Sequence, residues 1–345
     1  MPLPDGSTTP LLRASDIAVH YPIRRGVLQR VVGHVRAVDG VSLSIAPGET
    51  LGLVGESGCG KSSLARALLL LHRPTQGEIL FDAGQGPAIA LEQLPDSSLR
   101  LLRRHMQIVF QDPYSSLNPR LRIGRALTEP LRAMGLGDAA ERQARARVVL
   151  DAVGMPADAI ARFPHEFSGG QRQRIGIARA LAPKPRLVVL DEPVSSLDVS
   201  VRAQVLNLLQ ALQAELGLTY LFVSHDLSVV RYICDRVAVM YLGRIVEEGP
   251  TEALFRAPLH PYTEALLSAL PLPVAGMRRA RVRLRGDPPS PISLPTGCAF
   301  HPRCRFAQDR CRTEAPVLRA EGEGRAAACH FAPGLELAGA PTAAS

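Results

Sequence analysis

The chain has 345 residues, which suggests about two domains, and 46% of them are hydrophobic, enough for a sizeable buried core. It has no run of about 18 uninterrupted apolar residues, so we expect no transmembrane helix. Residues 1–10 lack the basic and apolar segments of a secretory signal, which predicts a cytosolic chain. The net charge of +8 permits an anionic partner, but the arginines are scattered and only 4% of residues are aromatic. A solvated, arginine-rich surface is therefore favoured over a nucleic-acid site.

The N-terminal part predicts strands. Residues 11–21 alternate between apolar and polar and end at Pro22, residues 26–36 resemble a basic surface turn, and residues 37–45 predict a second strand. Tyr21 allows two interpretations: an ordinary strand-end tyrosine, or a ring that stacks on an adenine.

A phosphate-binding loop pattern, G-x-x-x-x-G-K-[ST], follows the apolar run 50–54 and precedes a helix-forming run, 64–71. Its glycines let backbone N–H groups surround phosphate oxygens, and the helix N-terminus adds positive charge. Lys61 is one of only two lysines among the 40 Lys and Arg residues of a chain that otherwise uses arginine. The motif position therefore holds a lysine in particular, whose compact ammonium suits phosphate. We expect Lys61 to reach the β- and γ-phosphates and the Ser62 hydroxyl to bind Mg²⁺; the alternative is a chance glycine-rich turn. The loop comprises Gly55, Glu56, Ser57, Gly58, Cys59, Gly60, Lys61 and Ser62, and Ser63 follows.

The middle of the chain predicts strands at 76–81 and 106–110, and a helical insertion over 120–163. Ser168 then starts a basic helix that runs to residue 182. Its sequence, Ser168-Gly169-Gly170-Gln171, is compatible with an anion site at a helix start or with a plain capped helix.

Two acids end a buried strand, 187–190. Asp191 is placed to hold Mg²⁺ through water and Glu192 to activate a water molecule; the alternative is that both cap the next helix. That helix starts at Asp198 or Ser200 and ends at residue 217. A further strand, 220–223, precedes His225, which is either a γ-phosphate contact or structural.

Strands separated by helices, with the loop at the end of one strand, predict a parallel α/β sheet that binds nucleotide at its carboxyl edge. The pattern of residues 236–249 predicts a hairpin that turns at residues 242–243.

These segments, in this order, resemble the nucleotide-binding subunit of an ATP-binding cassette (ABC) transporter over residues 11–250. The resemblance implies a P-loop NTPase cassette with a mainly parallel RecA-like core sheet, an antiparallel β subdomain and a helical insertion. It assigns residues 55–62 as Walker A and residues 168–171 as the signature motif. It further implies that Gln111 is the Q-loop glutamine and Asp191 the Walker B aspartate, both of which contact Mg²⁺. Glu192 would be the catalytic glutamate and His225 the switch histidine, while residues 196–198 would form the D-loop. The ring of Tyr21 would stack on the adenine.

Residues 110–120, 163–166, 236–243 and 260–263 resemble more specifically the ATPases of dipeptide and oligopeptide permeases. These transporters have two related ATPases, and the Leu-Asn-Pro-Arg sequence at 117–120 is more similar to the second, F-type one. The resemblance implies ATP-driven import of di- or oligopeptides. The implied partners are a second, related ATPase in a heterodimer, two transmembrane permease subunits and an extracytoplasmic solute-binding protein, with no nucleic acid. The chain would lie peripherally on the cytoplasmic face of the membrane. Alternatives are import of nickel, an oligosaccharide or another solute, and a soluble ABC ATPase acting on nucleic acid or the ribosome.

The implied domains are 1–255 for the ATPase, with a helical subdomain over about 112–182, and 256–332 for a small cysteine-rich C-terminal extension. Residues 333–345 predict a disordered tail. The extension holds Cys298, Cys304, Cys311 and Cys329. Their spacing fits zinc poorly, while four thiolates can hold a [4Fe–4S] cluster, which the resemblance favours. Zinc and a metal-free site remain open.

Overall fold

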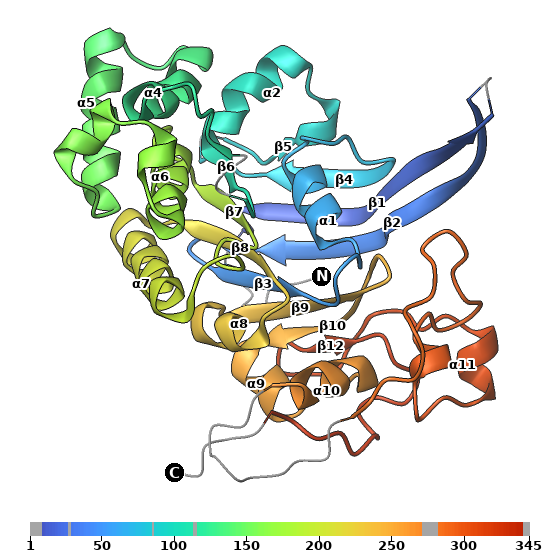
Figure 1. Ribbon diagram of the computed structural model, residues 1–345. Coiled ribbons are helices and arrows are strands. Elements are labelled where there is room, and N and C mark those ends of the chain that lie inside the picture. Colours follow the sequence, from blue (N-terminus) through green and yellow to red (C-terminus); the bar gives the residue numbers. More distant parts are fainter. Residues whose placement is uncertain (1–8, 27–28, 85, 113–115, 271–281, 341–345) are drawn as a thin grey trace.

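The computed structural model describes residues 9–26, 29–84, 86–112, 116–270 and 282–340 (Figure 1). The predictions that concern residues 113–115 and 341–345 lie outside these ranges. Among the helices of the described ranges, none combines the length and apolar character needed to cross a bilayer.

The central layer is an eight-stranded sheet in the order β11-β12-β10-β9-β3-β8-β7-β6. The strands from β6 through β7, β8 and β3 to β9 are parallel, as predicted, while β10, β12 and β11 continue the sheet antiparallel. Every residue of β3, β7 and β8 is buried. Helices cover one face of this part of the sheet, and the antiparallel sheet together with a helix covers the other. The strands are β3 (Thr50–Val54), β6 (Met106–Val109), β7 (Leu187–Asp191), β8 (Thr219–Ser224), β9 (Arg236–Tyr241), β10 (Arg244–Pro250), β11 (Arg319–Ala320) and β12 (Ala326–Ala327).

A second, antiparallel sheet has the order β2-β1-β4-β5 and contains β1 (Leu12–Arg25), β2 (Arg30–Ile45), β4 (Gln76–Phe81) and β5 (Ile89–Ala90). The prediction that the first strand ends at Pro22 is wrong. The turn predicted over 26–36 is too long, because the chain turns at Gly26 and Gln29 and β2 begins at Arg30. The β1–β2 ladder continues to Arg25 and Arg30. Strand β4 pairs with β1 only as far as Ala18, so the missing N–H of Pro22 costs no ladder hydrogen bond on that side.

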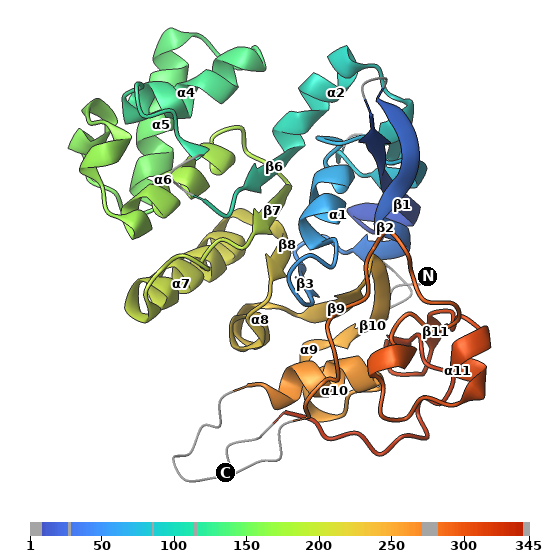
Figure 2. The same ribbon diagram turned by 45° about the vertical axis from the view of Figure 1, so that its right-hand side comes forward.

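The helical insertion consists of α4 (Ile123–Ala133) and α5 (Ala139–Ala152), followed by α6 (Gly169–Leu181). These helices lie at one end of the molecule, and the C-terminal extension lies at the other (Figure 2). The other α-helices of the described residues are α1 (Lys61–Leu68), α2 (Asp96–Leu102), α7 (Val199–Leu216), α8 (Leu227–Ile233), α9 (Thr251–Arg256), α10 (Pro261–Ser268) and α11 (Asp309–Thr313).

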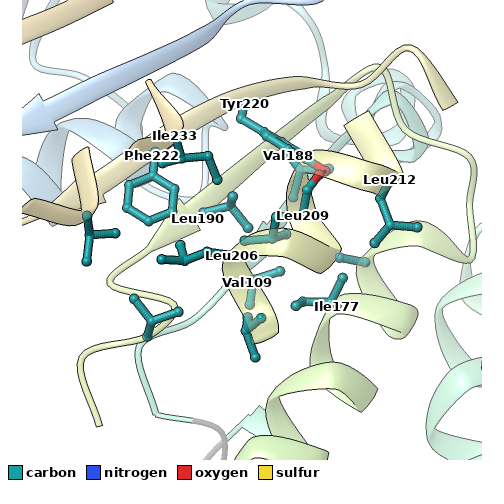
Figure 3. Packing of buried hydrophobic residues seen from close by; sticks show 14 of the residues in the cluster. Val109, Ile177, Val188, Leu190, Leu206, Leu209, Leu212, Tyr220, Phe222 and Ile233 are labelled. Atoms are coloured by element: carbon teal, nitrogen blue, oxygen red, sulfur yellow. Dashed lines mark hydrogen bonds between the residues drawn. The ribbon is translucent and has the colours of Figure 1, made fainter. Parts of the chain in front are cut away.

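Helix α7 packs on the parallel sheet and forms much of the core (Figure 3). Its N-cap is Asp198, whose carboxylate accepts a hydrogen bond from the N–H of Val201, so Ser200 is not the cap. Its buried side chains meet those of β7 and β8, and the Tyr220 hydroxyl donates to the carbonyl of Leu209 at 3.0 Å. The core residues labelled in Figure 3 are Val109, Ile177, Val188, Leu190, Leu206, Leu209, Leu212, Tyr220, Phe222 and Ile233.

The extension is joined to the cassette by sheet pairing. Strand β12 pairs with β10 through Glu247 and Glu248, so the sheet runs across the domain boundary expected at 255. In residues 333–340, where the sequence predicts a disordered tail, two backbone groups have partners in the fold. The N–H of Ala338 donates to the Glu264 carboxylate at 3.0 Å, and the N–H of Ala340 donates to the carbonyl of Phe255.

The core packing of α7 predicts the effect of Leu209→Ala. Leu209 is 1% exposed, so its truncation should lower the free energy of unfolding by about 2–5 kcal/mol. Urea denaturation measures this change. Leu216→Ala on the same helix is the control, because Leu216 is 48% exposed and should change stability by no more than about 0.5 kcal/mol. Equal effects of the two substitutions would contradict the packing described here.

Candidate nucleotide-binding site

The predicted phosphate loop connects β3 to α1, and two of its glycines are required by the backbone. Gly55 has a φ of 154° and Gly60 a φ of 108°. A Cβ atom would lie 2.2 Å from the carbonyl oxygen of Met240 at the first position and 2.0 Å from that of Ala37 at the second. Only glycine therefore allows the loop to turn this close to β9 and β2.

Lys61 opens helix α1 and is 5% exposed. Its ammonium donates to the carbonyl oxygens of Gly55 at 2.8 Å and Glu56 at 3.0 Å. The charge is thus held over the first residues of its own loop, next to the N-terminus of α1. Both features attract phosphate.

Ser62 and Asp191 meet although 129 residues separate them. The Ser62 hydroxyl donates to the Asp191 carboxylate at 2.9 Å. Asp191 ends β7 and is 2% exposed, and burial raises its pKa above the ordinary value, while the hydrogen bond from Ser62 acts in the opposite direction. A hydroxyl and a carboxylate oxygen at this distance are a donor set that suits Mg²⁺.

Glu192 contacts two of the other predicted residues. Its carboxylate accepts from the Gln111 side-chain amide at 2.7 Å and lies 3.0 Å from Nδ1 of His225. An ionised carboxylate only accepts, so Nδ1 of His225 carries the hydrogen. Gln111 follows β6 and His225 follows β8, the two neighbours of β7 in the sheet. Glu192 has a φ of 49°, and its N–H donates to the carbonyl of Val223 at 3.0 Å, which fixes this strained residue to β8.

Two predicted segments lie apart from this cluster. Tyr21 is on β1, where its ring centroid is 5.2 Å from that of His72. Ser168 caps α6: its hydroxyl accepts from the N–H of Gln171 at 3.3 Å, and the Gln171 side chain accepts from the N–H of Ser168 at 3.0 Å. Gly170 lies against Val201 of α7, where a Cβ atom would come within 2.3 Å. Across the described ranges, no hydrogen bond or ion pair joins residues 168–171 to residues 55–63.

Two residues of the extension contact the loop, and the sequence did not indicate either role. Tyr262 and Arg303 both bind Glu56. Tyr262 lies in the His-Pro-Tyr-Thr segment, and Arg303 directly precedes Cys304. Both stretches stand out in the sequence, but neither predicts a contact with the phosphate loop.

The four cysteines of the extension converge on one small cavity. Cys298, Cys304, Cys311 and Cys329 all line one cavity of about 20 Å³ beside Phe300. Burial raises the pKa of Cys304 to about 11 and also raises the pKa values of Cys298 and Cys329. Within the described ranges, no group of three or more His, Cys, Asp or Glu side chains is arranged to hold a metal ion. All four thiols are free.

The loop, the acids at the end of β7 and their neighbours define a nucleotide-binding cassette of the P-loop ATPase class. The ABC transporter family model matches residues 38–195, and the model of the oligopeptide/dipeptide transporter C-terminal region matches residues 246–311.

Curated relatives and solved structures agree with this class. A probable peptide ABC transporter ATP-binding protein of Sinorhizobium fredii is 54% identical over 93% of this chain and 89% of that protein. The dipeptide transport ATP-binding protein DppF of Haemophilus influenzae is 51% identical over 93% of this chain and 96% of its own length. A dimeric ATP-binding cassette, solved in a post-hydrolysis state with ADP and Pi, matches 70% of this chain and 98% of its own at 30% identity and a TM-score of 0.60.

The chain therefore belongs to the ABC transporter family, among the ATP-binding proteins of its peptide transporters. Its activity is ATP hydrolysis. The predicted family and fold class are confirmed.

The loop geometry predicts the effect of Gly60→Ala. The added Cβ would meet the carbonyl of Ala37 in a conformation that side chains rarely adopt, so ATP affinity should fall by about tenfold or more. Titration with a fluorescent ATP analogue measures the loss. Gly58→Ala is the control, because Gly58 has a φ of 79° but open space around a Cβ atom, and its loss should be smaller. Equal losses would show that the contact with β2 does not matter.

Proposed function

We propose that this chain is the ATP-hydrolysing subunit that powers import of di- or oligopeptides through an ABC transporter. The observation that carries the hydrolytic part is the contact of Glu192 with Gln111 and His225, beside the Ser62–Asp191 pair. The peptide cargo is supported by the match of residues 246–311 and by the names of relatives that are about half identical to this chain.

The proposed roles follow from position. The loop N–H groups and Lys61 bind the phosphates, and Ser62, Asp191 and Gln111 hold Mg²⁺, which when bound offsets the phosphate charge. The Glu192 carboxylate orients the attacking water and accepts its proton. His225 positions Glu192 through Nδ1 and faces the γ-phosphate; its side chain is 56% exposed and so is open to ligand. Tyr21 stacks on the adenine.

The signature segment acts on a second cassette. Ser168 and the N-terminus of α6 lie away from this chain's own loop, which supports a composite site in which each chain's signature covers the ATP of its partner. We propose that the partner is a distinct, related ATPase. Helices α4 and α5, with the residues that flank Gln111, would contact two permease subunits at the cytoplasmic face of the membrane, and a solute-binding protein would deliver the cargo.

The role of Glu192 predicts the behaviour of Glu192→Gln in the transporter reconstituted with its permease subunits. ATP should still bind, because the phosphate contacts remain, but turnover should fall by about a hundredfold or more, since the proton acceptor is lost. ATPase assays with and without peptide-loaded binding protein measure this.

Glu252→Gln is the control, because it removes a 70% exposed carboxylate that pairs with Arg231 and should leave turnover unchanged. Near-normal hydrolysis by Glu192→Gln would remove Glu192 from its role. Failure to assemble with permease subunits, together with salt-sensitive nucleic-acid binding, would overturn the transport function instead.

We further propose that the four cysteines of the extension hold a [4Fe–4S] cluster, with zinc as the alternative. The support is chemical: four thiols line one cavity in a chain that resembles peptide permease ATPases, and four thiolates are the usual ligands of such a cluster. No step of ATP hydrolysis depends on it.

Anaerobic purification with iron and sulfide analysis tests this proposal. We expect about four iron atoms per chain, lost in Cys304→Ser and retained in Cys234→Ala, because Cys234 lies on the cassette outside the cavity. Zinc near one atom per chain without iron would replace the cluster by a structural zinc site, and no metal would leave a purely packed extension.

A further inference from the structure

The phosphate loop is held by the C-terminal extension through one residue, Glu56. The hydroxyl oxygen of Tyr262 accepts a hydrogen bond from the Glu56 N–H at 2.8 Å. The guanidinium of Arg303 donates to both carboxylate oxygens of Glu56, at 2.8 and 3.1 Å. We propose that Tyr262 and Arg303 are positioning residues for ATP binding, which act on the phosphates through Glu56 and Lys61.

Glu56 is the point through which these contacts reach the nucleotide. Its carbonyl oxygen accepts from the Lys61 ammonium at 3.0 Å and from the N–H of Cys59 at 3.3 Å. The N–H and side chain of Glu56 therefore bind the extension, while its carbonyl binds the residues that face phosphate. A shift of Glu56 would move Lys61 and the turn before Gly60 together.

Tyr262 is built to be rigid. The fully buried carboxylate of Glu247, on β10, accepts from the N–H groups of Leu259 and His260 at 2.8 and 2.9 Å. His260, which is also buried, accepts from the N–H of Tyr262 at 3.1 Å through Nδ1 and so caps α10. Burial lowers the pKa of His260 to about 3, so the ring is neutral and keeps this acceptor at physiological pH. The cassette sheet thus fixes the start of the helix that carries the Tyr262 hydroxyl.

The aromatic packing around Tyr262 links it to Arg303. Its ring centroid lies 4.7 Å from that of Tyr241 and 5.5 Å from that of Phe300, while the Arg303 guanidinium lies 6.0 Å from the Tyr241 ring. The Arg303 side chain is only 7% exposed. The Glu56 side chain is 28% exposed, so this bidentate pair is partly shielded from water and is better defined in geometry than a surface ion pair. The two contacts on Glu56 therefore form one rigid support.

This geometry separates binding from chemistry. Tyr262 and Arg303 touch the loop on the side of Glu56, and neither contacts Glu192, Gln111 or His225. Lys61 and the loop N–H groups bind phosphate in both the ground state and the transition state, so a looser loop weakens both equally. Such a change raises KM and leaves kcat nearly unchanged.

The experiment compares Tyr262→Phe and Arg303→Gln with Arg305→Gln in the full-length chain. Arg305 also contacts both carboxylate oxygens of a glutamate, Glu264, but from one nitrogen, Nη2, and within the extension, away from the loop. We expect each of the first two variants to raise the Kd for Mg-ATP, and the KM, by about three- to tenfold. We expect kcat within about twofold and Arg305→Gln at the wild-type Kd. Titration calorimetry and steady-state ATPase assays supply these values.

Two further measurements separate positioning from loss of fold. Thermal melting of each variant reports folding, and Arg303→Lys keeps the charge without the two-pronged contact, so its Kd should lie between those of the wild type and Arg303→Gln. In the double variant Glu56→Gln with Arg303→Gln, the effects on Kd should be less than additive, because each substitution alone already breaks the same Arg303–Glu56 contact. The proposal is overturned if Tyr262→Phe and Arg303→Lys bind ATP as Arg305→Gln does. Because ATP binding by the chain itself is measured, this outcome is independent of the cargo proposed above.

Discussion

The parallel pairing of β3, β8, β7 and β6 is the constraint on which the site depends. Parallel strands end at the same edge of the sheet, so the residues that follow them meet there. Their register places the phosphate loop after β3, His225 after β8, Asp191 and Glu192 at the end of β7, and Gln111 after β6. Ser62 then reaches Asp191, and Glu192 bonds to neighbours on either side.

This arrangement requires unusual backbone conformations in the phosphate loop and at Glu192, which the surrounding fold stabilises. At Gly55 and Gly60 a side chain would clash with the carbonyl oxygens of Met240 and Ala37, respectively. Glu192 adopts a left-handed conformation despite its side chain, and a hydrogen bond to β8 holds it there. Non-glycine residues in this region cost of the order of 1–3 kcal/mol, so the surrounding sheet must fix the position of the carboxylate. A flexible surface loop would not keep it there.

The extension is part of the cassette in a structural sense. Strand β12 continues the central sheet beyond β10, residues 338 and 340 bond back to α10 and α9, and Glu56 is held by Tyr262 and Arg303. The polar connection to the loop and the shared sheet mean that the extension and the ATP site are one packed unit in the described ranges.

The phosphate loop, the acids at the end of β7, the cap at Ser168 and the alternation of strands and helices could all be predicted from the sequence, because each depends on residues close together in the chain. The sequence did not distinguish Asp198 from Ser200 as the cap of α7. It misjudged the ends of β1 and β2, since cross-strand pairing overrides a proline that faces the unpaired side. Which distant groups meet depends on the packing of the whole fold. The Ser62–Asp191 contact spans 129 residues and the Glu56–Arg303 contact 247, and no local pattern encodes a distance across the fold. The same holds for the cysteines, whose convergence on one cavity depends on how the extension packs.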